Sequence, residues 1–214
     1  GSDEAIDLLL RAFCRPGQDR IVICPPTYGM YAVSAGIQDA AVVSVPLTTE
    51  FQPDLPALQA QFADPRNKLL FLCSPNNPTG NLIDLDTVTT ILNQFPGLVV
   101  VDEAYIDFSP GASLLPKLKT FPNLVILQTF SKAWGLAGIR LGAAFASPEI
   151  VAILDRIKPP YNVNHLTQTR GLEALSNSSS IFKKRDELLR NRIDLQTQLS
   201  KLASVEHIFP SDAN

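Results

Sequence analysis

The stretch Leu98-Val-Val-Val-Asp102-Glu-Ala-Tyr105 places an acidic residue directly after an uninterrupted apolar run. A strand with one solvent-exposed face alternates polar and apolar residues. A continuous apolar run is instead typical of a strand buried on both faces, as in a parallel sheet covered by helices. Similar runs occur along the chain, and they predict further strands at Ile21–Cys24, Ala41–Val45, Lys68–Cys73, Leu124–Gln128 and Leu141–Phe145.

Amphipathic segments separate these predicted strands. They predict helices over Asp3–Phe13, Tyr28–Ala35, Asp54–Phe62, Asp84–Phe95 and Pro148–Ile157. Asp84 and Ser147 are residue types that suit helix N-termini. Because strand–helix–strand units follow one another, the pattern predicts an α/β fold, a three-layer sandwich around a mostly parallel sheet.

The pattern changes near residue 158, where Lys-Pro-Pro-Tyr-Asn interrupts the chain. A short helix over Thr167–Leu175, a loop over Ser176–Ser180 and a long helix from Ile181 to Ala203 are predicted next. Val205–Phe209 resembles the start of a strand. We therefore expect a large domain over residues 1–180. Residues 181–214 are expected to form a connecting helix and the incomplete start of a small C-terminal α+β domain.

The composition gives no support for several classes of partner. The 214 residues carry a net charge of −3 with no block of five like charges, so nothing favours binding to nucleic acid or to an anionic membrane. The two histidines are far apart, which argues against a histidine metal site. The three cysteines form no C-x-x-C pair and predict free thiols in a reducing compartment. With no long apolar segment, the prediction is a cytoplasmic protein.

Four polar clusters follow predicted strands or begin a helix, and the carboxyl edge of an open α/β sheet is where ligands bind. The richest cluster follows the strand Leu124–Gln128. Its hydroxyls, Thr129 and Ser131, and its guanidinium, Arg140, suit a phosphate group. The amine of Lys132 between them suits an aldehyde carbon, although an isolated lysine is ordinarily a surface residue. The nearby glycines do not fit the G-x-G-x-x-G dinucleotide pattern.

Two more clusters follow apolar strands. Asp102 can hold a ring N–H in its protonated form, or can cap a turn. Tyr105 can bond a phenolic oxygen or simply pack. Asn77 lies in Ser74-Pro-Asn-Asn-Pro-Thr-Gly80, a turn-forming sequence that can also direct an amide into the cleft.

The remaining candidates lie near the start of the chain. At Ser2 and Asp3 a helix N-terminus offers backbone N–H groups to an anion, although acidic residues there also complement the helix dipole. Tyr28 follows a strand and can stack on a planar ring or pack as an ordinary aromatic residue. Together the clusters supply an amine, an acid for a ring nitrogen, donors for a phenolate, a phosphate cup and a stacking ring. That set matches pyridoxal phosphate part by part.

The sequence resembles the fold-type-I pyridoxal-phosphate-dependent aminotransferases, and among them the histidinol-phosphate aminotransferases. The matching stretches are Gly-Ser-Asp-Glu-Ala-Ile (1–6), Cys-Pro-Pro-Thr-Tyr-Gly-Met-Tyr (24–31), Cys-Ser-Pro-Asn-Asn-Pro-Thr-Gly (73–80), Asp-Glu-Ala-Tyr-Ile-Asp-Phe (102–108), Thr-Phe-Ser-Lys-Ala-Trp-Gly-Leu-Ala-Gly-Ile-Arg (129–140) and Pro-Ser-Asp-Ala-Asn (210–214). The resemblance implies that Lys132 holds the cofactor as a Schiff base and then moves a proton. It also implies that Asp102 pairs with the pyridine nitrogen, while Tyr105 and Asn77 bond the phenolic oxygen. Thr129, Ser131, Arg140 and the backbone near Ser2 and Asp3 would hold the phosphate, and Tyr28 would stack on the ring. Lys132, Asp102 and Tyr105 are the implied catalytic residues.

The implied reaction belongs to histidine biosynthesis. An amino group passes between glutamate and imidazole-acetol phosphate, giving histidinol phosphate and 2-oxoglutarate, in a homodimer with its sites at the subunit interface. Chains of this family are longer at both ends, so we expect an N-terminal arm and a C-terminal substrate-binding arginine to be missing here. The alternatives are an aromatic-amino-acid aminotransferase or a phosphothreonine decarboxylase on the same scaffold, or an inactive cofactor-binding fragment.

Overall fold

A six-stranded sheet forms the centre of the computed structural model, which describes residues 1–214. Its strand order is β2-β1-β3-β4-β5-β6, in which the first five strands pair in parallel and β6 runs antiparallel to β5. The strands are β1 Arg20–Ile23, β2 Ala41–Ser44, β3 Asn67–Cys73, β4 Leu98–Asp102, β5 Leu124–Thr129 and β6 Gly142–Phe145. The predicted mostly parallel sheet is confirmed, and each strand lies within one residue of its predicted bounds.

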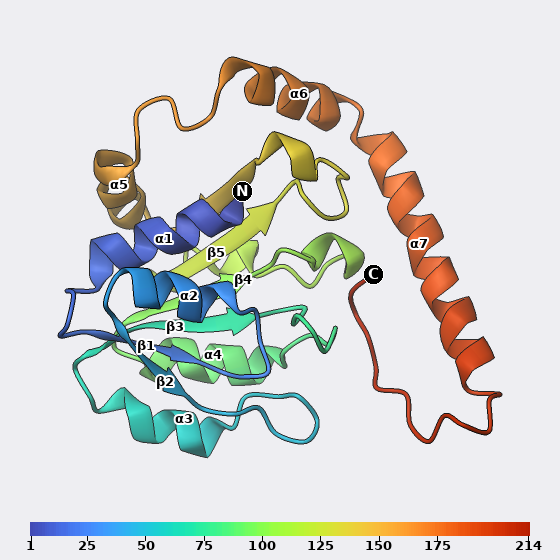
Figure 1. Ribbon diagram of the computed structural model, residues 1–214, viewed down its shortest axis with the longest axis horizontal. Coiled ribbons are helices and arrows are strands. Elements are labelled where there is room, and N and C mark those ends of the chain that lie inside the picture. Colours follow the sequence, from blue (N-terminus) through green and yellow to red (C-terminus); the bar gives the residue numbers. More distant parts are fainter.

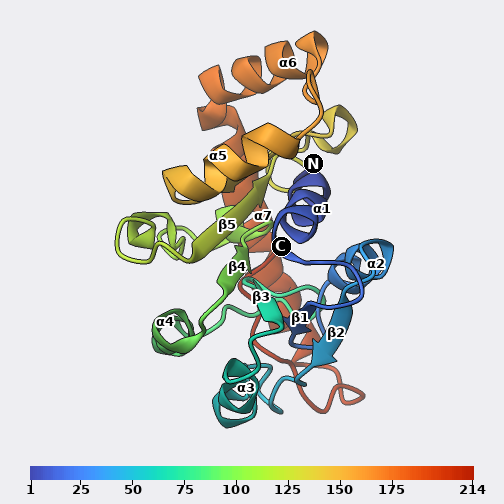
Figure 2. The same cartoon turned by 90° about the vertical axis from the view of Figure 1, so that its left-hand side faces the viewer.

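Helices cover both faces of this sheet (Figures 1 and 2). One face carries α1 Ser2–Phe13, α2 Met30–Ile37 and α5 Pro148–Ile157. The other carries α3 Leu55–Phe62 and α4 Leu85–Gln94. Asp84 caps α4 as expected, since its Oδ2 accepts a hydrogen bond from the Thr87 N–H at 2.9 Å. The three-layer sandwich is therefore present.

Alternate residues of each central strand enter different cores. In β4, Val100 packs with α1, α2 and α5, whereas Val99 and Val101 pack with α3 and α4. All three valines are completely buried, and each such side chain contributes roughly 1.5–3 kcal/mol through its burial. Because helices cover both faces of the sheet at β4, the sequence of this strand is apolar without alternation.

The chain beyond α5 departs from two predictions. The loop expected over Ser176–Ser180 is wrong, because only Asn177 separates α6 His165–Ser176 from α7 Ser178–Leu199. Serines suit a first helical turn as well as a loop, and here they begin α7. The strand expected at Val205–Phe209 is also wrong. This segment pairs with no strand, and without a partner it has no ladder to join.

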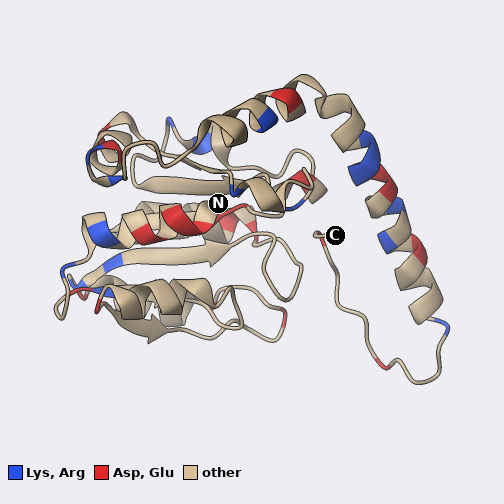
Figure 3. Ribbon diagram, turned by 45° about the horizontal axis from the view of Figure 1, so that its top comes forward, with Lys and Arg blue, Asp and Glu red and all other residues tan.

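Helix α7 leaves the sandwich and the chain then returns toward the sheet edge (Figure 1). Its contact with the sandwich includes Phe182, whose ring lies edge-on to Trp134 with a centroid distance of 5.8 Å. Basic and acidic residues are interspersed along α7 (Figure 3), as expected for a helix face in water. We find no helix with both the length and the apolarity needed to cross a membrane.

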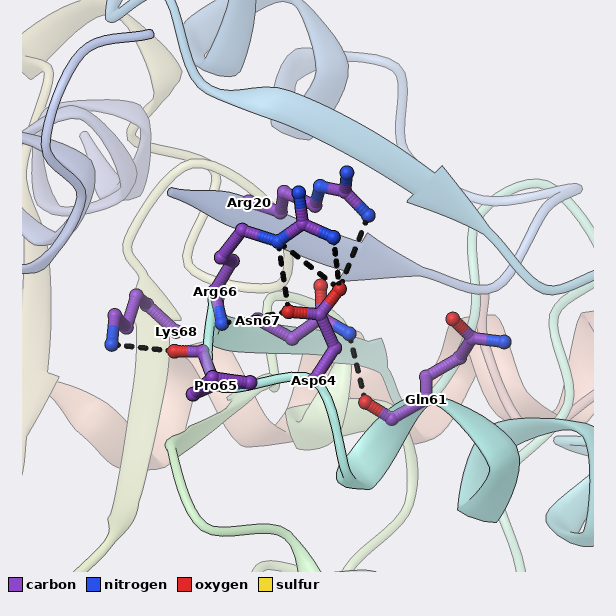
Figure 4. A network of polar contacts seen from close by, with 7 residues as sticks. All are labelled: Arg20, Gln61, Asp64, Pro65, Arg66, Asn67 and Lys68. Atoms are coloured by element: carbon purple, nitrogen blue, oxygen red, sulfur yellow. Dashed lines mark hydrogen bonds and ion pairs between the residues drawn. The ribbon is translucent and has the colours of Figure 1, made fainter. Parts of the chain in front are cut away.

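A polar network stabilises the amino ends of β1 and β3, at the edge opposite the candidate site (Figure 4). Asp64 accepts hydrogen bonds from Arg66 Nη2 at 2.7 Å and from Arg20 Nη1 at 3.3 Å. The Arg66 guanidinium in particular holds the pKa of Asp64 well below its usual value. Asn67 Nδ2 donates to the Gln61 carbonyl at 2.8 Å. These contacts join the end of α3 and the segment after it to the amino ends of β1 and β3.

Candidate active site

A cavity of about 190 Å³ opens at the carboxyl edge of the sheet. It is bounded by the first turn of α1, the ends of β4 and β5, and the loops that follow them. All ten residues singled out from the sequence line this one cavity: Ser2, Asp3, Tyr28, Asn77, Asp102, Tyr105, Thr129, Ser131, Lys132 and Arg140. Residues up to 138 positions apart in the sequence thus meet where the parallel strands end.

Asp102 ends β4 and is almost completely buried. Its Oδ1 accepts a hydrogen bond from the Ala104 N–H at 3.0 Å, and its Oδ2 accepts one from the Tyr31 hydroxyl at 2.8 Å. Burial raises the pKa of Asp102 to about 6, while the bonds from Tyr31 and Ala104 oppose that rise. The carboxyl is therefore ionised at neutral pH, but only by a narrow margin.

Lys132 follows β5 in a loop that the Thr129 hydroxyl shapes. Thr129 Oγ1 accepts a hydrogen bond from the Ser131 N–H at 3.1 Å and lies 3.0 Å from Ser131 Oγ. The Lys132 Nζ atom lies 4.9 Å from the centre of the Tyr105 ring, a cation–π distance. An amine, a phenol and two hydroxyls therefore face the same space.

Asp3 connects the start of α1 to two other elements. Its Oδ2 accepts a hydrogen bond from Arg140 Nη2 at 3.3 Å, and its Oδ1 accepts one from the Tyr28 hydroxyl at 3.0 Å. Burial and this carboxylate raise the pKa of Tyr28 to about 12, so the phenol stays protonated. Arg140 has a φ of 53°, a left-handed conformation at the turn that leads into β6.

The first turn of α1 lies against β6 because residue 142 is glycine. A Cβ atom at Gly142 would lie 2.5 Å from the backbone nitrogen of Ser2, too close for any side chain. The first N–H groups of a helix have no partners within the helix and carry the positive end of its dipole. Gly142 thus allows the first turn of α1 to reach the cavity wall.

The loop that carries Asn77 is held by the end of the chain. The Gly80 carbonyl accepts hydrogen bonds from the backbone N–H groups of Asp212 at 2.7 Å and Ala213 at 3.0 Å. In return, Asp212 Oδ2 accepts one from the Leu82 N–H at 2.8 Å. Gly80 has a φ of 79°, which favours glycine at this turn.

Two neighbours of the cavity were not assigned a role from the sequence. The Tyr31 hydroxyl donates a hydrogen bond to Asp102. The sequence signal that would have singled it out is a tyrosine inside an apolar helix, since a buried phenol needs a polar partner. Cys73 lines the wall. Burial raises its pKa to about 12, so its thiol stays protonated and unreactive. All three cysteines are buried and free, as predicted.

Comparison with known proteins identifies the family. The model of the family "Aminotransferase class I and II" matches residues 1–214, which is the whole chain. The chain belongs to this family. It is 56% identical over all 214 residues to the histidinol-phosphate aminotransferase of Cytophaga hutchinsonii, of which it spans 61%.

Solved structures agree on the fold. The histidinol-phosphate aminotransferase of Sinorhizobium meliloti, in complex with pyridoxal-5'-phosphate, is 26% identical with a TM-score of 0.87; the match covers this whole chain and 58% of that one. The L-threonine-O-3-phosphate decarboxylase of Porphyromonas gingivalis is 25% identical with a TM-score of 0.82, covering all of this chain and 66% of that one. The scaffold is therefore shared by enzymes of different chemistry.

Proposed function

We propose that this chain forms the cofactor-binding core of a pyridoxal-phosphate-dependent histidinol-phosphate aminotransferase. The reaction moves an amino group from glutamate to imidazole-acetol phosphate and gives histidinol phosphate and 2-oxoglutarate. The observation that carries the proposal is that ten residues matched to this chemistry line one cavity, in a chain 56% identical to such an enzyme. Because the chain spans about three fifths of that relative, the reaction is assigned to the whole protein.

The donor set of the cavity fits pyridoxal phosphate. Thr129, Ser131 and Arg140, with the first turn of α1, offer hydroxyls, a guanidinium and backbone N–H groups to a phosphate. On the deeper side, the buried Asp102 carboxyl suits a protonated ring nitrogen. Asn77 and Tyr105 would bond the phenolic oxygen.

When bound, pyridoxal phosphate supplies an aldehyde carbon that accepts amines and a ring that withdraws electrons from the carbon next to them. The protein's residues would transfer the substrate α-proton and keep the ring nitrogen protonated. Lys132 Nζ would hold the aldehyde carbon until a substrate amine replaces it, and would then take the proton from the substrate α-carbon. The ionised Asp102 would keep the ring nitrogen protonated, and Tyr28 would cover the ring.

Three proposals concern the whole protein. Residues 181–214 would be a connecting helix and the start of a second domain, which the exposed apolar residues Leu188, Ile193 and Leu195 of α7 support. A homodimer would cover exposed apolar side chains such as Leu166, which is 76% exposed. The enzyme would work in the cytoplasm, where free thiols persist.

Substrate comparison with the full-length protein tests the proposed reaction. We expect transamination to be faster with histidinol phosphate than with phenylalanine, and no carbon dioxide to be released from phosphothreonine. Faster reaction with phenylalanine would assign the aromatic amino acids instead. Release of carbon dioxide would assign the decarboxylase chemistry of the Porphyromonas gingivalis enzyme, and no turnover with any substrate would indicate a cofactor-binding protein without this activity.

A further inference from the structure

Tyr31 is a fully buried polar side chain in contact with Asp102, which lines the cavity. Its hydroxyl donates a hydrogen bond to Asp102 Oδ2 at 2.8 Å. Its ring is fixed from two sides. It stacks on Phe71 with a centroid distance of 4.7 Å and an angle of 16° between the planes, and it meets the edge of Tyr28 at 5.6 Å. Packing of this kind leaves the hydroxyl with a defined direction.

Apart from the hydrogen bonds from Tyr31 and Ala104, the influences on the pKa of Asp102 oppose its negative charge. Burial is the largest influence, and the carboxylates of Asp3 on α1 and Glu103 on the same strand end also raise the pKa of Asp102. The Cys73 thiol of β3, close by, is neutral. No ion pair of the structure includes Asp102. The groups that favour its ionised form by direct hydrogen bonds are therefore the Tyr31 hydroxyl and the Ala104 N–H.

We propose that Tyr31 is a positioning residue that keeps Asp102 ionised and oriented toward the cavity. Its role toward the cofactor rests on the function proposed above, whereas its role toward Asp102 does not. With Oδ2 held by Tyr31 and Oδ1 held by the Ala104 N–H, the carboxyl plane is fixed. Each carboxylate oxygen has a second lone pair, which leaves room for one more donor. The protonated ring nitrogen would be that donor.

Tyr31→Phe removes only the hydroxyl and keeps the ring on Phe71. A hydrogen bond to a charged group stabilises that charge enough to move a titration midpoint by about one to two pH units. We expect the midpoint of Asp102 to rise by this amount in the variant. Because the starting value of this pKa is about 6, Asp102 would change from largely ionised to at least about half protonated at pH 7.

The first test uses the purified full-length protein without cofactor. The carboxyl carbons of aspartate are labelled with ¹³C and titrated by NMR, and the signal that disappears in Asp102→Asn identifies Asp102. We expect an upward shift of the midpoint in Tyr31→Phe and none in Tyr161→Phe, because Tyr161 is 95% exposed and far from this carboxyl in the chain. An unchanged midpoint in Tyr31→Phe would overturn the proposal.

A packing control separates the hydroxyl from the ring. Phe71→Leu removes the surface on which Tyr31 stacks but leaves its hydroxyl in place. This variant should unfold at lower denaturant concentration, and its Asp102 midpoint should rise less than that of Tyr31→Phe, because the hydroxyl is still present. An equal rise of the midpoint in Phe71→Leu and Tyr31→Phe would mean that packing, rather than the hydrogen bond, is responsible.

A second test uses the protein with bound pyridoxal phosphate. If Asp102 is protonated more easily, the ring nitrogen would lose its proton at lower pH, and ¹⁵N NMR of cofactor labelled at that nitrogen should show a lower titration midpoint in Tyr31→Phe. Turnover should fall by about tenfold with KM nearly unchanged. A higher KM with unchanged kcat would contradict the role. Failure of the unaltered protein to bind pyridoxal phosphate would refute the proposed function, and the NMR titration would still decide the role of Tyr31.

Discussion

Replacing Asp102 by asparagine should change the pH dependence of stability in the cofactor-free protein. Relative to the unaltered protein, the variant should gain stability as the pH rises. Burial raises the pKa of this carboxyl from its usual 3.8 to about 6 in the folded state. The folded protein therefore binds the proton more tightly than the unfolded chain does. The stability associated with Asp102 is intact below about pH 4 and is lost as the pH rises through 6.

The size of the effect follows from the two pKa values. A difference of about two units corresponds to a loss of about 3 kcal/mol at pH 8, where both states are ionised. At pH 5 the loss is about 1.5 kcal/mol, because the folded state is still mostly protonated there. Asparagine does not titrate. The free energy of unfolding of Asp102→Asn minus that of the unaltered protein should therefore increase by about 1.5 kcal/mol between pH 5 and pH 8.

Urea unfolding at the two pH values, followed by circular dichroism, measures this difference. Asp107, another carboxyl with a raised pKa, is present in both proteins and is not among the groups that shift the pKa of Asp102, so its contribution cancels in the comparison. Asparagine changes the hydrogen bond with Tyr31, which adds an offset common to both pH values. If the two proteins lose or gain stability in parallel from pH 5 to pH 8, Asp102 does not titrate as argued.

Three other substitutions test separate parts of the structure. Lys132→Ala should abolish covalent attachment of pyridoxal phosphate, and a reducible bond to the cofactor that survives, detected by intact mass, would reject the lysine assignment. Gly142→Ala should cost about 1–3 kcal/mol of stability and weaken cofactor binding in a fluorescence titration, because its Cβ would collide with the Ser2 nitrogen. Unchanged binding would show that the α1 turn does not contact the cofactor. Glu103→Ala removes an acceptor that Ser113, Leu114 and Gln128 share, at 2.7, 2.7 and 2.8 Å; a loss of about 3 kcal/mol is expected in urea unfolding, and a loss below 1 kcal/mol would mean that water satisfies these donors.

The sequence predicted the sheet well because burial on both faces strongly restricts which residues a strand can contain. A strand buried on both faces must be apolar throughout, and Val99, Val100 and Val101 carry that signal without ambiguity. That the candidate residues line one cavity followed from the same fact, since polar residues directly after such strands meet at one edge of the sheet. What the pattern alone did not show is that Asp3 joins Arg140 and Tyr28, because contacts between distant loops leave no periodic trace.

The two wrong predictions, a loop and a strand, also have physical reasons. Asn177 separates two helices with a single residue, and serines on either side suit a loop as well as a first helical turn. Val205–Phe209 has a composition suited to a strand, but a strand forms only beside a partner, and the structure provides none. The hydrogen bond from Tyr31 to Asp102 joins residues 71 positions apart. Only the three-dimensional structure could reveal it.

The visible absorption spectrum of the purified full-length protein with pyridoxal phosphate, recorded before and after addition of histidinol phosphate, tests the central proposal most directly. We expect a long-wavelength band from the lysine-bound cofactor, which histidinol phosphate converts to the band of the aminated cofactor. A band that does not change when histidinol phosphate is added would contradict the proposed substrate but would still support the proposed cofactor site. The absence of any such band would contradict the assignment of Lys132 and of the cavity around it.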